Sequence, residues 1–292
     1  MKVASASSTA KVIAASTILL AGERNPSNEV APGAAELCRI FLSTNLSDRC
    51  LAACAGQRHA RRILRLLERM TLPGIIAHYW RRKRWIEHRC RMAIEGGFER
   101  IVILGAGFDT LGMRLSTEFA RLEVVELDHP ATQRVKRTAL ANNLIPLPGN
   151  FRLCEVDLTR EKLPVTAGAD KPTVFIIEGL LMYLSEDDVS TLFDRLHECA
   201  PPGTRVIFSF MSRWPDGGSG FRPHSRLIDW WLRVKHEPFT WAIEPEAIDS
   251  FLASGNFKLM EMALAHELDP RANLQPGSLK GENLVICELV PK

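Results

Sequence analysis

Apolar residues recur at helical spacing through the first third of the chain. They fall every three or four positions in residues 34–42, 61–70 and 75–94, as on the buried face of an amphipathic helix. An apolar run over 12–21 is short, carries Ser and Thr, and is not followed by a clear small-residue cleavage site. It therefore favours a first helix over a secretory signal. We expect residues 1–97 to form an N-terminal helical cap.

After this region the pattern changes to short apolar runs separated by amphipathic segments. Such runs predict buried strands at residues 101–104, 122–126, 151–156, 173–177, 205–210, 257–262 and 283–290. Between them, Pro130 opens a helical segment over 131–141, and Ser185 is placed to cap a helix over 186–199. Strands that alternate with helices require right-handed crossovers and a parallel sheet covered on both faces. We therefore expect a Rossmann-like α/β domain over 98–292 with seven strands.

Residues 211–245 break this alternation and are rich in aromatic side chains. They contain Trp214, Phe221, Trp230, Trp231, Phe239 and Trp241. None of the chain's six tryptophans falls within the expected sheet core. Substrate pockets are lined mainly by apolar and aromatic groups, so a lid over a substrate site is one interpretation. A satellite core or a contact in a homodimer explains the same residues equally well.

Composition and charge narrow the class of protein. The 292 residues are 46% hydrophobic and 24% charged, as in a soluble globular protein, and carry a formal charge of +3. A net charge this small produces no strong electrostatic field that would attract nucleic acid or an anionic membrane. No apolar run approaches the roughly 18 residues needed to cross a bilayer. The seven cysteines are odd in number and scattered. They favour reduced thiols in a cytoplasmic protein without a metal site.

Two basic stretches, residues 58–69 and 78–91, raise the question of phosphate binding. In the second, Trp80, Trp85 and Ile86 recur at helical spacing among the charges. That pattern is typical of an amphipathic helix with a solvated polar face. We therefore expect no nucleic acid partner.

Glycines and acids follow the first two predicted strands. Gly105 and Gly107 come after the first, but Thr110 occupies the place of the third glycine in a dinucleotide fingerprint. A nicotinamide oxidoreductase is therefore less favoured. Glu126 and Asp128 end the second strand, where an acid can accept hydrogen bonds from the ribose hydroxyls of an adenosyl ligand.

Asp157 and Leu158 follow the third predicted strand. A carboxylate beside an apolar side chain suits an adenine, with the amino group donating to Asp157 and the ring packed on Leu158. Each acid alone is equally well explained as an ordinary strand-end residue. Acids after successive strands, together with the glycines, indicate an adenosyl-ligand site at the carboxyl edge of the sheet.

Three blocks of sequence resemble the leucine carboxyl methyltransferase family. They are IVILGAGFDTLGMRL at 101–115, ELDHPATQRVK at 126–136 and EGLLMYL at 178–184, within a similarity that extends from about Tyr79 to Phe257. This family is a branch of the Rossmann-like, S-adenosylmethionine-dependent methyltransferases and includes tetracenomycin-type O-methyltransferases of polyketide biosynthesis. The resemblance implies an enzyme with S-adenosylmethionine as cofactor and S-adenosylhomocysteine as product.

The resemblance also implies roles for individual residues. Arg82, with Arg84 as the second choice, would meet the carboxylate of the cofactor, and Lys11 would contact the ligand region. Glu178 would lie near the amino end of the cofactor and the position of methyl transfer. The full set of cofactor-binding residues implied is Lys11, Arg82, Gly105, Gly107, Glu126 or Asp128, Asp157, Leu158 and Glu178.

The implied reaction is an in-line displacement in which an acceptor oxygen takes the methyl group. A carboxylate acceptor is already ionised and needs no base, whereas a phenol of pKa ~10 would benefit from one. The candidates for catalysis are Glu178, Tyr183, His224 and His236, each also explained as a packing or surface residue. We expect a small-molecule O-methyltransferase. A methyltransferase acting on a protein C-terminus and a non-catalytic adenosyl-ligand-binding protein are the alternatives.

Overall fold

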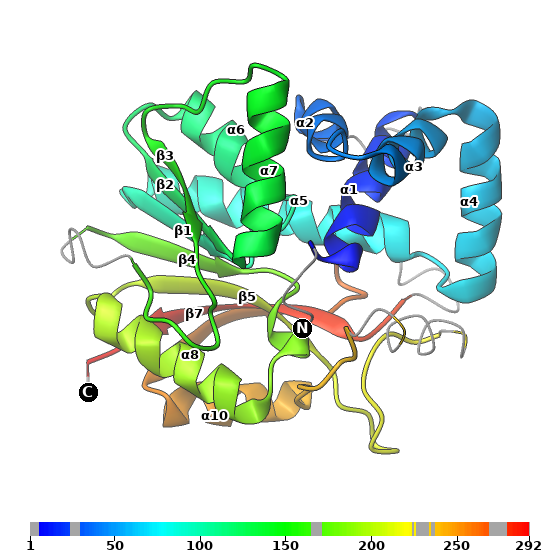
Figure 1. Ribbon diagram of the computed structural model, residues 1–292. Coiled ribbons are helices and arrows are strands. Elements are labelled where there is room, and N and C mark those ends of the chain that lie inside the picture. The colour runs from blue at the N-terminus through cyan, green and yellow to red at the C-terminus, as the bar shows by residue number, and fades with distance from the viewer. Residues whose placement is uncertain are drawn as a thin grey trace.

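Seven strands form one central sheet in the order β3-β2-β1-β4-β5-β7-β6 (Figure 1). The computed structural model describes residues 6–23, 30–164, 171–223, 225, 234, 237–268 and 279–291. The strands are β1 (Arg100–Leu104), β2 (Glu123–Asp128), β3 (Phe151–Glu155), β4 (Thr173–Ile177), β5 (Arg205–Met211), β6 (Phe257–Ala263) and β7 (Glu282–Leu289). Strands β1 to β5 pair in parallel, and β7 is antiparallel to both β5 and β6. The predicted seven-stranded Rossmann-like sheet is confirmed, with an antiparallel edge.

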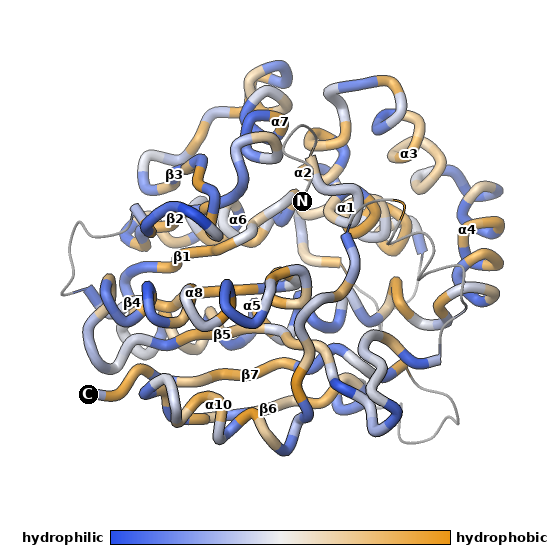
Figure 2. The backbone as a smooth tube through the Cα atoms, turned by 60° about the horizontal axis from the view of Figure 1, so that its bottom comes forward, coloured by the Kyte–Doolittle hydropathy of each residue, from blue (hydrophilic) through white to orange (hydrophobic). Residues whose placement is uncertain are grey.

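Alternating side chains of the strands build a core on each face of the sheet. Ile101 and Ile103 of β1 pack on one side, and Val102 and Leu104 on the other, as the two-residue period of a strand requires. The central strands are apolar along most of their length (Figure 2). The first face is covered by α5 (Ile75–Glu95), α6 (Leu111–Glu118) and α7 (Pro130–Asn142), and the second by α8 (Glu186–Cys199) and α10 (Ile248–Ser254).

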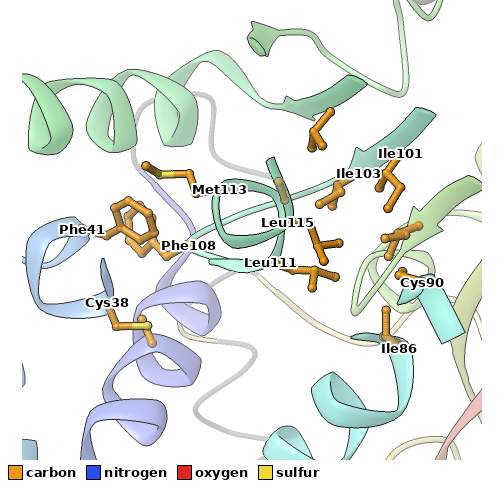
Figure 3. Close-up of a cluster of buried hydrophobic side chains, with 14 of the residues drawn as sticks. Cys38, Phe41, Ile86, Cys90, Ile101, Ile103, Phe108, Leu111, Met113 and Leu115 are labelled. Carbon is orange, nitrogen blue, oxygen red and sulfur yellow. The ribbon is translucent and has the colours of Figure 1, made fainter. Parts of the chain in front are cut away.

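In the described part of the chain, four further helices precede α5. They are α1 (Ser8–Ala21), α2 (Ala34–Phe41), α3 (Leu46–Gly56) and α4 (Arg58–Thr71). The sequence pattern did not predict α3, because its small residues and scattered apolar positions give it little contrast between faces. Phe41 of α2 packs on Phe108 of the loop after β1, with ring centroids 6.1 Å apart (Figure 3). The N-terminal helices therefore rest on the turn that carries the glycines. None of the helices in the described ranges is long and apolar enough to span a membrane.

The aromatic segment contributes to two separate cores. Trp241 is buried in the core beneath α8 and α10, 5.6 Å from the ring of Phe251. The expectation that no tryptophan enters the sheet core was therefore wrong for Trp241, because the chain returns to the sheet after its excursion. Phe221 and Phe239 instead pack beside the short helix η2 (Leu181–Tyr183). Trp230 and Trp231 lie outside the described residues.

Candidate functional site

The turn after β1 brings backbone close to two neighbouring elements. Gly105 and Gly107 have φ angles of +66° and +52°, a region that residues with a Cβ rarely adopt. A Cβ on Gly107 would lie 3.2 Å from the Cβ of Ala10 in α1, and one on Gly105 would lie 3.1 Å from Leu180. Both glycines are thus required by the turn and by close packing above it.

Of the two acids that end β2, Asp128 faces this turn. Its carboxylate accepts hydrogen bonds from the backbone N–H groups of Gly107 and His129. Burial raises the pKa of Asp128, and these two hydrogen bonds oppose the rise. The carboxylate therefore joins the end of β2 to the glycine turn.

Glu126 points into the protein instead. It is fully buried, and its carboxylate lies 2.5 Å from the Lys136 ammonium, which also donates to the carbonyl of Asp109 at 2.7 Å. Burial raises the pKa of Glu126 to about 7. This buried pair is joined to the glycine loop through the carbonyl of Asp109. Because the Glu126 side chain is fully buried, a ribose could not contact it in this structure.

Arg82 of α5 joins two carboxylates from distant parts of the chain. Its Nη1 donates to both oxygens of Glu282 at 2.6 and 2.7 Å, and its Nη2 lies 2.6 Å from Oε1 of Glu178. His78 Nε2 lies 3.0 Å from the same Glu282 carboxylate. Burial opposes ionisation of Glu282, but Arg82 and His78 outweigh it and hold the pKa of Glu282 at about 2.

Lys83, the next residue along α5, joins the glycine loop to the end of β4. Its ammonium lies 3.0 Å from Asp109 and 3.0 Å from Glu178. Burial raises the pKa of Asp109, but Lys83 and Lys136 outweigh it and lower that pKa to about 2.

The sequence did not predict His78, Lys83, Asp109 or Glu282 as residues of the site. Asp109 lies within the sequence block 101–115 that resembles the family. No pattern near Glu282 indicates a role in the site, because its partner Arg82 lies two hundred residues away in the sequence.

Two cavities meet at this cluster of charges. The first, the glycine-loop cavity, has about 100 Å³ and lies between Gly105, Gly107, Asp128, Glu178 and α1. The second, the apolar cavity, has about 470 Å³ and is lined mainly by aliphatic side chains of α1, α3, α4 and α5. The residues that line both are Thr9, Ile13, Arg82, Gly179 and Tyr183.

Several predicted residues lie at this junction and others do not. Arg82 rather than Arg84 is the buried arginine of the site, since Arg84 is exposed. Tyr183 is hydrogen-bonded to the Thr9 side chain, and burial raises its pKa. Lys11 is not among the residues that line either cavity, and its ammonium lies 2.9 Å from the carboxylate of Asp48.

The remaining predicted residues are not among the described lining of either cavity. Asp157 follows β3 beside the end of β2, but its carboxylate accepts from the backbone N–H and hydroxyl of Thr159 at 3.0 and 2.7 Å. Leu158 packs in the core of the sheet. His224 and His236 lie outside the described residues.

The fold and the site together define a class. A doubly wound sheet with a glycine turn after β1 and acids at the ends of β2 and β4 is the Rossmann-like arrangement in which ligands bind at the carboxyl ends of strands. The chain belongs to the leucine carboxyl methyltransferase family, whose model matches residues 36–197, more than half of the 292. The predicted family is thus confirmed, and with it the class of S-adenosylmethionine-dependent methyltransferases.

Individual relatives agree with this assignment. A Bacillus subtilis protein provisionally named S-adenosyl-L-methionine-dependent methyltransferase YktD is 30% identical over 118 residues, 39% of each chain. A Mycobacterium marinum protein of the same provisional name is 34% identical over 159 residues, 52% of this chain and 51% of its own. The match thus spans about half or less of these relatives. A Thermobifida fusca crystal structure, provisionally described as a methyltransferase, has the same fold, with a TM-score of 0.59, 18% identity, and coverage of 87% of this chain and 94% of its own.

The residues present fit the cofactor of this class in their chemistry. The buried Asp128 carboxylate suits a ribose diol, and Arg82 with Glu178 suits the carboxylate and ammonium of an amino acid. The two glycines let the backbone of the turn approach its neighbours more closely than a Cβ would allow. S-Adenosylmethionine carries the same groups: a diol, a carboxylate and an ammonium.

Proposed function

We propose that this chain transfers the methyl group of S-adenosylmethionine to a carboxylate oxygen of an apolar small molecule. The observation that carries the proposal is the meeting of the two cavities at Arg82, Gly179 and Tyr183. When bound, S-adenosylmethionine supplies an electrophilic methyl group. The protein's own task is to bring an acceptor oxygen to this junction in the right orientation.

The cofactor site is proposed to follow the ends of the first four strands. Backbone at Gly105 and Gly107 would face the methionine part, and the Arg82–Glu178 pair would hold its charged end. Asp128 would accept hydrogen bonds from the ribose. Asp157 and Leu158, one strand further along the same edge, are proposed for the adenine, because Val156 N–H bonds the carbonyl of Asp128 at 2.9 Å and so keeps the two strand ends together.

The titratable groups of the apolar cavity favour an acceptor that arrives already ionised. Burial raises the pKa of Tyr79 and of Tyr183, so both stay protonated as hydrogen-bond donors. Glu282, with a pKa of about 2, is a weak base. The described lining of this cavity contains no histidine. A carboxylate needs no base, and the two tyrosines provide donors for its oxygens.

The size and chemistry of the cavity favour a small molecule over a protein C-terminus. Its volume of about 470 Å³ falls in the range of ~300–1,000 Å³ typical of small-molecule pockets. A peptide would place N–H and C=O groups against aliphatic side chains such as Leu19, Leu51 and Leu64, where they would lack partners. The hydrocarbon part of an apolar acid has no such groups, and only its carboxylate needs partners, which the donors at the junction provide.

The test uses methyl-labelled S-adenosylmethionine with carboxylic acids, and with alcohols and phenols of equal carbon number. We expect label in a product that releases methanol under mild base, as a methyl ester does and an ether does not. Label in base-stable product would overturn the carboxylate assignment. Calorimetric binding of S-adenosylhomocysteine without any transfer would support a non-catalytic ligand-binding protein instead.

A matched pair of variants locates the acceptor. Val12 lines the apolar cavity and is 41% exposed, so Val12→Trp should fill the cavity without disturbing the fold. Met92 is similarly exposed on α5, outside both cavities, and Met92→Trp is the control. We expect loss of methyl transfer in the first variant only, with S-adenosylhomocysteine affinity unchanged in both.

A further inference from the structure

Helix α4 exposes the side chains that an amphipathic helix normally buries. Ile63, Leu66, Leu67 and Met70 are 61%, 56%, 51% and 68% exposed. They stand at positions i, i+3, i+4 and i+7, and so form one continuous apolar stripe on the helix. We call these four residues the outer stripe.

Two polar residues of the same helix, Arg65 and Glu68, are turned toward the protein. Glu68 is 8% exposed, and its carboxylate accepts from Arg65 at 2.7 Å and from the backbone N–H of Ile76 at 3.0 Å. Arg65 also donates to Glu23 at 2.8 Å. These ion pairs, together with Leu64, which packs against the core, hold α4 in place and leave the outer stripe exposed.

Cationic side chains border the outer stripe. Arg62 and Arg69 are exposed and stand four residues before and three residues after Leu66, which places them beside it on the helix. Arg58, in the first turn, is exposed as well. The one acid of α4, Glu68, faces inward. Although the whole chain carries only +3, the outward side of this helix is basic.

The outer stripe is continuous with the wall of the apolar cavity. Leu67 belongs to both, and Leu64 and Thr71 of the same helix also line the cavity. Helix α4 stands at the periphery of the molecule in both views (Figures 1 and 2). A surface that received this helix would therefore lie next to the cavity.

We propose that α4 docks on an anionic lipid surface, with the outer stripe among the acyl chains and Arg58, Arg62 and Arg69 at the headgroup phosphates. Basic helices with one strongly apolar face lie in the plane of the interface in this way. Each arginine near an anionic surface strengthens binding roughly fivefold. The neighbouring cavity then takes apolar molecules directly from the lipid. This proposal does not depend on the nature of the methyl acceptor.

Charge argues against a second copy of the chain as the occupant. Two outer stripes in contact would bring the exposed arginines of both helices together. No acid of α4 faces outward to pair with them, because Glu68 is engaged by Arg65 and Ile76. Anionic headgroups complement this surface, whereas an identical surface repels it.

The experiment is flotation of the full chain with vesicles of phosphatidylcholine alone and of phosphatidylcholine with one quarter phosphatidylglycerol. We expect binding to the anionic vesicles that weakens as salt is raised. Arg62→Gln with Arg69→Gln should weaken it about 25-fold. Leu66→Glu with Met70→Glu should abolish it. Leu46→Glu, at an apolar residue that is 74% exposed on α3, should leave it unchanged.

Two further readouts keep the result interpretable. Every changed residue is exposed, so thermal unfolding and S-adenosylhomocysteine affinity should match the parent chain, and a variant that fails this check is replaced by the single substitution Met70→Glu. Absence of binding to anionic vesicles, or equal binding by the stripe variant, would overturn the proposal. A dimer in sedimentation velocity that the stripe variant loses would instead assign the stripe to a protein interface.

Discussion

The carboxylate of Glu237 caps the first turn of α1 through Thr9. It accepts from the Thr9 hydroxyl and from the backbone N–H groups of Ser8 and Thr9 at 3.0 and 3.1 Å. The first turn of a helix leaves N–H groups without partners, and its dipole favours a negative charge there. The end of the aromatic segment is thus tied to the helix that covers Gly107.

Loosening this cap should speed ligand exchange. Helix α1 lines the glycine-loop cavity through Thr9, Ala10 and Ile13, and Ala10 covers Gly107, so we expect α1 to move when an adenosyl ligand enters. Glu237→Gln should lower the free energy of unfolding by about 0.5–2 kcal/mol and raise the S-adenosylhomocysteine dissociation rate severalfold. Stopped-flow fluorescence measures the rate, with Glu246→Gln, at an exposed acid, as control. If Glu237→Gln and the parent chain release S-adenosylhomocysteine at equal rates, the ligand does not leave through movement of the first turn of α1.

Arg82 should be hard to replace even by lysine. Its planar guanidinium bonds Glu178 and Glu282 at once, and a single ammonium cannot reproduce that fork. Arg82→Lys leaves a buried carboxylate with too few partners, which typically costs about 3–5 kcal/mol. Urea unfolding checks this value. Arg84→Lys, on the exposed side of the same helix, is the control and should change the free energy of unfolding by no more than ~0.5 kcal/mol. A similar loss in both variants would show that the bonds from Arg82 to Glu178 and Glu282 are not what stabilises this region.

Buried carboxylates also set the dependence of stability on pH. Glu282 and Asp109 have pKa values of about 2 in the folded chain, below their ordinary values of 4.5 and 3.8. The unfolded chain therefore binds protons first, and the stabilisation is complete above about pH 5 and is lost as the pH falls toward 2. For Glu282 the difference between 4.5 and about 2 corresponds to roughly 3 kcal/mol.

Urea unfolding at pH 6, 5, 4 and 3 measures how the free energy of unfolding falls as the pH is lowered. Glu282→Gln should be less stable at every pH but should lose less stability between pH 5 and 3. Glu126 acts in the opposite sense at higher pH, because burial raises its pKa to about 7 and its ionisation costs stability as the pH rises from 4.5. Parallel pH curves for the parent and Glu282→Gln would show that Glu282 does not titrate as described.

The fold could be predicted from the sequence because its signals are local. Strands such as Ile101–Leu104 are continuous apolar runs, and Ser185 caps α8 through the backbone N–H of Asp188 at 3.2 Å, as its position indicated. Helix α3 escaped prediction because small residues leave no clear periodicity. Trp241 could not be placed because its burial depends on the return of the chain to the sheet.

The site was only partly predictable. Residues next to a strand end, such as Gly107 and Asp128, could be found because topology alone brings them to one edge. The choice between Glu126 and Asp128 could not be made, since both point to the same face of β2 and the choice depends on which of them lies beside the buried Lys136. Glu282 and Glu237 approach Arg82 and Thr9 across some two hundred residues of sequence. Such pairings are set by tertiary packing, which no local pattern records.

Asp157 separates the proposed adenine role from a merely structural one. Its side chain is 29% exposed, and the turn it caps at Thr159 is local, so Asp157→Ala should change the unfolding temperature little. If the carboxylate accepts the adenine amino group, calorimetry should show S-adenosylhomocysteine binding weakened about five- to a hundredfold, or roughly 1–3 kcal/mol. Asp194→Ala, at an exposed acid on α8, is the control. An affinity equal to that of the control would remove Asp157 from the cofactor site, and Asp128 would then be the acid on which adenosyl binding depends.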